Sequence, residues 1–453
     1  MLFNSMTFLF VFLPLLLIIY FIIKPKHKNK VLLVFSILFY AWGEPKFIFL
    51  VLISIIINHF LALKIEKNRS TKKYLILSLI LNLGVLFIFK YLNFIFEIVC
   101  GIINVENFQL NLRLPIGISF YTFQLTSYMV DVYRGKTEAS KNIFDLATYL
   151  LFFPQLIAGP IIRYNDMANE LKQRTVVFSN VVDGLRRFVI GLAKKVLLAN
   201  TIANIVDTIF MPGYEIDCFS FTFGILAFAL QIYYDFGGYS DMAIGLGKIF
   251  GFDFKENFSY PYISLSVREF WHRWHMSLAT WLRDYIYIPL GGNRCSKFKW
   301  VRNIFVVWMF SGLWHGSSYQ LLAWALYLWV VTIFEKIFSS KLEKLPKIIR
   351  WFYTAILILI CFVIFRVGNP LDYVFVNRSF MDFVRHYYYL FNYIPFVIVG
   401  CIFIFPIYPM IEKKFKENVI FNYLKDIVLV LLFIVSIMFI ISNDYTPFIY
   451  FKF

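Results

Sequence analysis

Long apolar runs, separated by short clusters of basic residues, constrain this chain more than any other feature of its sequence. Hydrophobic residues make up 60% of the 453 positions, against roughly 45–50% in an average soluble domain. Phe alone occurs 55 times. A soluble protein could not bury so much apolar surface, so lipid must cover much of it. The sequence therefore predicts an integral membrane protein and excludes a secreted disulfide scaffold, a disordered chain and a cytosolic enzyme.

Of the 44 Lys and Arg residues behind the net charge of +17, 18 lie in four basic clusters between apolar runs. The clusters are Lys24, Lys26, Lys28 and Lys30; Lys64, Lys67, Arg69, Lys72 and Lys73; Lys336, Lys341, Lys344, Lys347 and Arg350; and Lys413, Lys414, Lys416 and Lys425. Short basic loops stay in the cytoplasm during membrane insertion. We therefore place all four clusters inside and expect both termini outside the cell. Contact with anionic lipid explains this charge adequately, and we expect no nucleic-acid partner.

With the clusters inside, the flanking apolar runs form a consistent set of membrane spans. The spans are the run ending at Ile23, Val31–Trp42, Phe47–Leu63, Trp351–Val367, Pro395–Pro409 and Ile427–Ile441. The first run is expected to be retained rather than cleaved, because four Lys follow it and no basic residue precedes it, the reverse of a signal peptide.

Residues 112–320 differ from the flanks, because Gly, Pro and polar residues repeatedly interrupt the apolar sequence there. Broken helices at membrane depth must lie inside protein or line a water-filled cavity. We therefore expect an all-α polytopic fold in which ordinary spans surround a core of broken or re-entrant helices. Cytoplasmic loops joining short spans are the alternative. The chain is then one membrane domain, with N-terminal spans in 1–111, the core in 112–335 and C-terminal spans in 336–453.

Two carboxylates follow the apolar run Phe219–Tyr234, in the stretch Asp235-Phe236-Gly237-Gly238-Tyr239-Ser240-Asp241. Ionisable residues in a membrane are costly unless they are satisfied, so they point to a functional site. The two glycines permit a sharp turn. The alternative is a structural helix break, in which the Asp side chains cap a helix over Met242–Phe250.

A second polar segment begins at Ser266-Val267-Arg268-Glu269, which matches a capping box with Ser as N-cap and Glu at N3. The pattern predicts a helix from about Val267 to about Tyr287, ended by Pro289 and the glycines after it. This helix would carry Trp271, His272, Trp274, His275, Trp281, Arg283 and Asp284. Tryptophans mixed with charge are typical of a membrane interface or a wet cavity.

A third segment, Ser311-Gly312-Leu313-Trp314-His315-Gly316, interrupts an apolar run that otherwise reaches from Ile304 to Phe334. The glycines allow a kink or a close approach of backbone or ligand. A buried His costs free energy unless it is paired, so His315 is either a satisfied core histidine or a functional one.

Three of the six histidines fall in these segments, and two kinds of chemistry fit them. His272, His275 and His315 could ligate zinc with one open position. General base chemistry is the simpler interpretation, because imidazole titrates near neutral pH and burial keeps it unprotonated. The five cysteines lack Cys-x-x-Cys spacing and are interpreted as buried thiols. We expect neither a metal nor a bound cofactor.

Over roughly residues 5–335 the chain resembles the membrane-bound O-acyltransferase family, and within it the bacterial alginate O-acetyltransferase branch. The matching stretches are 114–124, 131–135, 153–155, 158–161, 235–241, 274–285, 288–294 and 313–316. The resemblance implies a ring of membrane helices around a thinned core, with a tunnel that joins a cytoplasmic donor to an extracellular acceptor.

The resemblance also implies roles for single residues. His315 falls on the catalytic histidine of the family, and His275 on the second histidine of this branch. His272 lies where relatives often have Arg, Lys or Asn, which weakens the zinc interpretation. The expected substrate-channel residues are Trp274, Trp314, Asp235, Asp241, Arg283 and Asp284.

The function expected from these features is transfer of an acetyl group from a cytoplasmic thioester, such as acetyl-CoA, to an extracellular or cell-wall polysaccharide. Relatives act with a surface-anchored partner that resembles an SGNH-type esterase. Two alternatives stay open, which are D-alanyl transfer to teichoic acid and a non-enzymatic polysaccharide transporter. The expected location is the bacterial plasma membrane.

Overall fold

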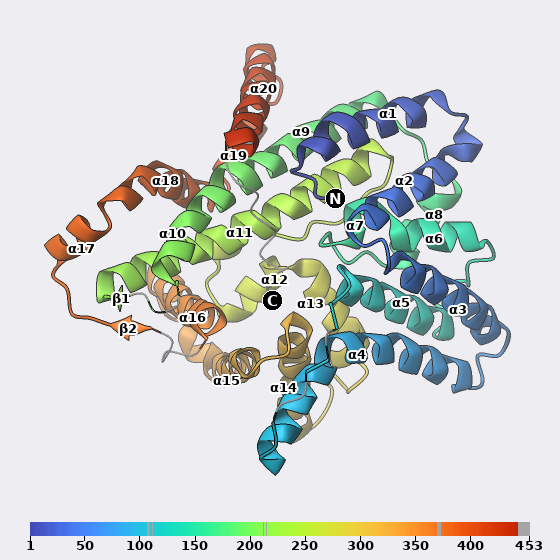
Figure 1. Cartoon of the computed structure of the whole chain (residues 1–453), viewed down its shortest axis with the longest axis horizontal. Helices are drawn as coiled ribbons and strands as arrows, with labels where there is room; N and C mark the ends of the chain where they lie inside the picture. Colours follow the sequence, from blue (N-terminus) through green and yellow to red (C-terminus); the bar gives the residue numbers. More distant parts are fainter. Residues whose placement is uncertain (107–108, 111, 212, 214, 369–372, 443–453) are drawn as a thin grey trace. The chain divides into compact units, whose positions relative to one another are not determined.

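The computed structural model describes residues 1–106, 109–110, 112–211, 213, 215–368 and 373–442, which are mostly helical with very little strand (Figure 1). They form two compact units. The first unit is Met1–Leu185 with Met242–Lys255, and the second is Arg186–Asp241 with Glu256–Phe453. The helices α9 and α11 each run through a boundary between these units. The prediction of an all-α polytopic membrane protein is confirmed.

The first unit is built mainly from the N-terminal helices. They are η1 (Phe8–Phe12), α1 (Leu13–Ile22), η2 (Pro25–His27), α2 (Lys28–Gly43), α3 (Ile48–Lys67), α4 (Lys73–Ile103), α5 (Ile118–Tyr133), α6 (Ile143–Leu151), α7 (Phe153–Leu156), α8 (Tyr164–Lys172) and the start of α9 (Phe178–Ala193).

The second unit holds the remaining elements. They are η3 (Lys194–Asn200), α10 (Thr201–Ile209), β1 (Glu215–Ile216), most of α11 (Cys218–Ile249), η4 (Pro261–Ile263), α12 (Val267–Arg273), α13 (Met276–Leu282), η5 (Arg283–Tyr287), α14 (Lys297–His315), α15 (Tyr319–Leu342), α16 (Lys347–Val367), β2 (Val374–Phe375), α17 (Phe380–His386), η7 (Tyr388–Tyr393), α18 (Ile394–Phe403), α19 (Ile407–Phe415) and α20 (Val419–Ser442). The two strands pair in parallel, with Glu215 opposite Val374.

Seven helices in the described part of the chain are long and apolar enough to cross a membrane. They are Ile48–Lys67, Lys73–Ile103, Phe178–Ile209, Cys218–Ile249, Tyr319–Leu342, Lys347–Val367 and Val419–Ser442. Spans predicted at residues 47–63, 351–367 and 427–441 lie within or against three of them. The predicted exit of the C-terminus falls on residues 443–453, outside the described residues.

The expectation that residues 112–320 hold only broken helices is wrong in part. Phe178–Ile209 and Cys218–Ile249 are both 32-residue spans within that stretch. Their polar residues do not break them, because most of the apolar stretch of each helix is buried inside the protein. The buried share is 61% for the first helix and 72% for the second. Polar side chains in such helices find partners within the molecule rather than facing lipid.

The first unit shows how polar groups are satisfied inside a largely apolar helix bundle. Asn58 on α3 and Asn82 on α4 exchange two side-chain hydrogen bonds, each 2.8 Å long. The helix α5 starts after Gly117, whose φ of +78° favours glycine. A Cβ on Gly117 would also lie 2.7 Å from the carbonyl oxygen of Leu156. The Pro and Gly that interrupt the apolar sequence at Leu114–Gly117 therefore form the turn into a buried helix.

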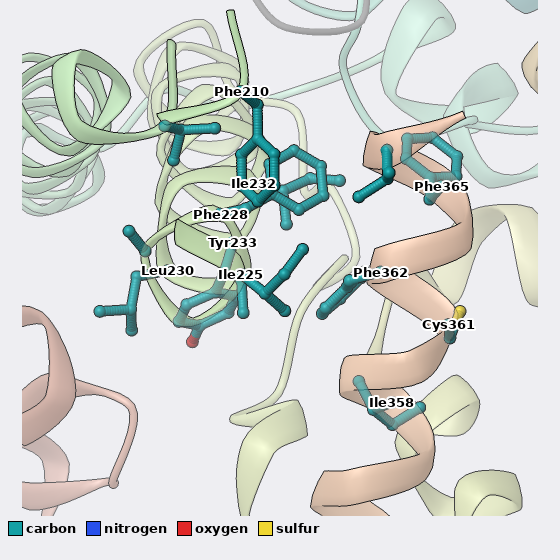
Figure 2. Packing of buried hydrophobic residues seen from close by; sticks show 14 of the residues in the cluster. Phe210, Ile225, Phe228, Leu230, Ile232, Tyr233, Ile358, Cys361, Phe362 and Phe365 are labelled. Carbon is teal, nitrogen blue, oxygen red and sulfur yellow. The ribbon is translucent and has the colours of Figure 1, made fainter. Parts of the chain in front are cut away.

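A hydrophobic core in the second unit joins α11 to α16 (Figure 2). Phe228 on α11 meets Phe362 on α16 edge to face, with ring centroids 6.0 Å apart. Ile225 and Ile358 extend the same core along the two helices. This packing holds α16 beside α11, and α15 packs on α16 in turn.

The cysteines are free thiols, as expected, but only one of them is buried. Cys361 is fully buried on α16 and accepts a hydrogen bond from the indole of Trp324 at 2.9 Å. Cys218 and Cys401 are exposed, and Cys100 and Cys295 are half-buried. The prediction that these four thiols are buried within the protein is wrong, because lying in or beside an apolar run does not show whether a side chain faces protein or the outer surface.

Candidate functional site

The predicted turn between Asp235 and Asp241 is absent, and α11 passes straight through both residues. The reason lies in Gly238, where a Cβ would come within 2.8 Å of the Gly191 carbonyl oxygen and 3.0 Å of the Lys195 backbone nitrogen. The glycine serves close approach of two helices rather than a change of direction. The alternative, that the Asp side chains cap a new helix at Met242, is wrong because α11 continues without a break through Met242 to Ile249.

Basic residues of α9 and η3 neutralise both carboxylates. Lys195 pairs with Asp235, and both side chains are almost completely buried. Asp241 accepts hydrogen bonds from Lys194 at 2.7 Å and from Arg187 at 2.8 Å. The two Asp residues therefore join α11 to the neighbouring span, and their expected place in a substrate channel stays a prediction.

The single helix predicted over 267–287 is divided in three. The chain breaks between α12 and α13 at His275, which has φ +45° and ψ +53°, a left-handed conformation that is uncommon outside glycine. A preceding segment fills the break, because Ser259 donates its N–H to the Arg273 carbonyl and Met276 donates to the Asn257 carbonyl, both at 2.9 Å. Only a distant part of the chain satisfies these groups, so the helical pattern alone could not show the break.

The start of α12 follows the prediction. Ser266 is the N-cap, and its hydroxyl accepts a hydrogen bond from the Glu269 N–H at 3.0 Å. The buried Glu335 of α15 adds a second cap that the sequence did not reveal. Its carboxylate accepts from the N–H groups of Val267 and Arg268 at 2.7 and 3.0 Å. Four such N–H groups at any helix start need partners.

His275 is buried, with 2% of its surface exposed, and its two ring nitrogens differ. Nδ1 lies 3.1 Å from Oδ1 of Asn257. Nε2 is buried and has no hydrogen-bond partner among the described residues. The ring of Phe236 packs against the imidazole in a T-shaped arrangement, with centroids 4.6 Å apart. Burial lowers the pKa of His275 well below its usual value, and the neighbouring His315 lowers it further. The imidazole is therefore neutral near pH 7.

His315 is the last residue of α14, where the helix ends before Gly316, so the predicted interruption of the apolar run is confirmed. Its ring contacts Trp324 and Phe365, with centroids 5.2 and 5.6 Å away. Gly312 allows the close packing of α14 on α15 that places it there, since a Cβ would meet the Leu321 carbonyl oxygen at 2.7 Å.

Trp314 links the two histidines. Its ring centroid is 4.9 Å from that of His315 and 5.7 Å from that of His275. The structure thus brings together His275, His315 and Trp314, three of the residues that the sequence singled out. They come from the α12–α13 break and from the end of α14.

The other singled-out residues lie differently. His272 is exposed and its Nδ1 donates to the Arg268 carbonyl at 2.7 Å. Among the described residues no three His, Cys, Asp or Glu side chains lie close enough together to hold a metal ion, so the three histidines do not form the zinc ligand set considered above. Trp274 is buried in the hydrophobic core, stacked on Phe270. Arg283 and Asp284 form an ion pair with each other on η5 at 2.7 Å. Their expected roles in a channel stay predictions.

These features define a polytopic membrane protein in which two buried histidines flank a tryptophan. The sequence model of the membrane-bound O-acyltransferase family matches residues 37–367. The chain belongs to this family, and it is therefore an O-acyltransferase.

Similar proteins refine the comparison. The chain is 41% identical to the probable alginate O-acetylase AlgI of Pseudomonas aeruginosa, over 82% of this chain and 72% of the relative. It is 34% identical to a peptidoglycan O-acetyltransferase of Helicobacter pylori, over 82% and 77%. It is 30% identical to a teichoic acid D-alanyltransferase of Bacillus subtilis, over 60% and 70%.

Proposed function

We propose that this chain moves an acetyl group from a cytoplasmic thioester, such as acetyl-CoA, across the plasma membrane for O-acetylation of an extracellular or cell-wall polysaccharide. The observation that carries the proposal is the buried pair His275 and His315 around Trp314. The greater identity to an alginate O-acetylase and a peptidoglycan O-acetyltransferase than to a D-alanyltransferase favours acetyl as the group transferred.

The chemistry needs a base near a carbonyl. The acceptor hydroxyl oxygen attacks the thioester carbonyl carbon, the hydroxyl proton passes to an imidazole, and the carbon–sulfur bond then breaks. The thiolate leaves and takes the proton back from the imidazolium. We assign the attack to His315, which accepts the hydroxyl proton or assists at the donor carbonyl. His275 orients the acceptor or stabilises the oxyanion.

The locations of donor and acceptor support transfer through the membrane. Thioester donors are made in the cytoplasm, whereas surface sugars lie outside, so a site within the membrane spares either large molecule the passage through lipid. By analogy with relatives that act with a partner, we propose that the first acceptor is a hydroxyl on an SGNH-like surface protein that relays acetyl to the polysaccharide.

The test is a strain in which His315→Ala replaces the native chain. Acetate released by mild alkali from surface polysaccharide should fall to the level of a deletion strain, because the site loses the imidazole that acts in the attack. His272→Ala is the matched control, since His272 is exposed and lies outside the histidine pair. It should leave the acetate unchanged.

Other outcomes separate the alternatives. Unchanged acetate in the His315→Ala strain, with the protein still in the membrane, would contradict the proposal. Loss of D-alanine esters instead of acetyl esters would favour D-alanyl transfer. Loss of the polysaccharide itself, with normal esterification of what remains, would favour a transporter.

A further inference from the structure

We propose that Asn257 holds His275 in the Nδ1–H tautomer and so presents an unprotonated Nε2 to the attacking hydroxyl. Asn257 is a positioning residue, because it acts through His275 and not on substrate. The inference rests on the proposed acyl transfer and deepens it. It gives the hydroxyl proton to His275 and leaves His315 to assist at the donor carbonyl.

The orientation of the Asn257 amide is the first step. The backbone N–H of Ser277 lies 3.2 Å from Asn257 Oδ1, and a backbone N–H can only donate. The Ser277 hydroxyl donates to the same oxygen at 2.9 Å. At its other end, Asn257 Nδ2 donates to the Ser240 hydroxyl at 3.0 Å. The oxygen end of the amide therefore faces His275.

The tautomer follows from that orientation. His275 Nδ1 is 3.1 Å from an oxygen that can only accept, so Nδ1 carries the proton. A neutral imidazole has one proton, which leaves the lone pair on Nε2. Nε2 can then accept a proton from a hydroxyl, but it cannot donate to an oxyanion. Of the two roles that we assigned to His275 above, this excludes stabilisation of the oxyanion and keeps orientation of the acceptor, to which it adds acceptance of the hydroxyl proton.

The surroundings keep this arrangement rigid. Asn257 is completely buried, and its own carbonyl accepts the Met276 N–H at 2.9 Å. One residue thus holds both the side chain of His275 and the start of α13. The left-handed backbone of His275 persists because these contacts over-determine it, a form of strain that is common at functional sites.

Nε2 itself points to a missing hydrogen-bond partner. It is buried, and no described group donates to it. Buried polar atoms are nearly always paired, and an acceptor hydroxyl would supply the donor. On attack the oxygen–carbon bond forms, the hydroxyl proton moves to Nε2, and the carbon–sulfur bond breaks as the thiolate departs. The thiolate recovers the proton from His275.

The direct test is solid-state nitrogen NMR of the full chain in lipid bilayers with ¹⁵N-labelled histidine. The sequence has six histidines, and loss of one pair of signals in His275→Gln assigns the pair that belongs to His275. At neutral pH we expect a protonated Nδ1 and an unprotonated Nε2. A proton on Nε2 in the wild-type chain would overturn the proposal.

Two variants of Asn257 extend the test. Asn257→Asp keeps the acceptor oxygen and adds a charge, so the His275 signals should become those of imidazolium at neutral pH. Asn257→Leu removes the acceptor, so both tautomers should appear. Surface acetyl esters should fall at least about tenfold in Asn257→Leu, since a wrong tautomer can cost up to roughly 10⁴ in turnover.

Asn418 supplies the matched control, because its Oδ1 also accepts a backbone N–H, that of Phe421 at 3.0 Å, but at an exposed helix start. Asn418→Leu and Asn418→Asp should leave the His275 signals and the acetyl esters unchanged. If Asn257→Leu does not fold, the wild-type and Asn257→Asp spectra still decide. Absence of acetyl transfer by the wild-type chain would sink the proposed function, whereas transfer with unaltered His275 signals in Asn257→Asp would sink only this inference.

Discussion

At the scale of single residues, the second unit shows that buried charges are neutralised by partners of opposite charge within the protein. Lys195 and Asp235 have side chains exposed by only 4% and 3%. Removing one partner of a buried ion pair strands the other, which is strongly destabilising, whereas replacing both with apolar residues is often tolerated. The pair therefore gives a test of whether Asp235 is structural or belongs to a substrate channel.

We expect Asp235→Leu to lower the free energy of unfolding by about 3–5 kcal/mol, because the Lys195 ammonium loses its carboxylate. The double variant Lys195→Met/Asp235→Leu should recover most of that loss, measured as the thermal unfolding midpoint in detergent. A stable double variant that still acetylates would make the pair structural. A stable double variant without acetyl transfer would instead support the channel role expected from the sequence.

Residue identity and pattern predicted part of the site. His275 and His315 could be singled out because the chain has only six histidines, and because His315 interrupts an apolar run while His275 lies among tryptophans and charged residues on a predicted helix. Asn257 could not, because its role comes from a contact with a residue 18 positions away, and no local pattern marks an asparagine as a partner of histidine. The role of Glu335 could not be predicted for the same reason, since Glu335 caps α12 from 68 residues away.

At the scale of elements, local signals were reliable and non-local ones were not. The capping box at Ser266 was predictable because both partners lie within one turn. The continuity of α11 was not, because Gly237 and Gly238 permit either a turn or a close helix contact. What decides between them is the neighbouring span, whose Gly191 carbonyl approaches Gly238.

The two adjacent glycines give a matched pair of variants. A Cβ at Gly238 would lie 2.8 Å from the Gly191 carbonyl oxygen, whereas at Gly237 the nearest atom is 3.9 Å away. Gly238→Ala should therefore lower the thermal midpoint, as overpacking typically costs about 1–3 kcal/mol. Gly237→Ala should match or exceed the wild type, since Ala favours a helix over Gly by about 1 kcal/mol. Equal midpoints for the two variants would contradict the close helix contact.

At the scale of the whole molecule, hydropathy predicted the class of fold because lipid imposes a simple rule on every span. An apolar helix of about 20 residues is needed wherever the chain crosses, and that requirement can be read without knowing any contact. The prediction of a core of broken helices was correct only in part. Hydropathy cannot distinguish a polar residue that pairs with a neighbouring helix from one that ends its own helix. Membrane orientation follows from the basic clusters alone and so needs its own test.

Two exposed lysines in the first unit provide that test. Lys72 lies in the second basic cluster, which we expect inside, and Lys46 lies in the turn between α2 and α3, which we expect outside. In a background where only the buried Cys361 remains, Lys46→Cys should react with a membrane-impermeant maleimide on cells with an intact plasma membrane. Lys72→Cys should react only after permeabilisation, because α3 lies between the two positions. Labelling of Lys72→Cys in intact cells would contradict the expected topology. The second basic cluster would then lie outside the cell, and the proposed direction of acetyl transfer would lose the support of the basic clusters.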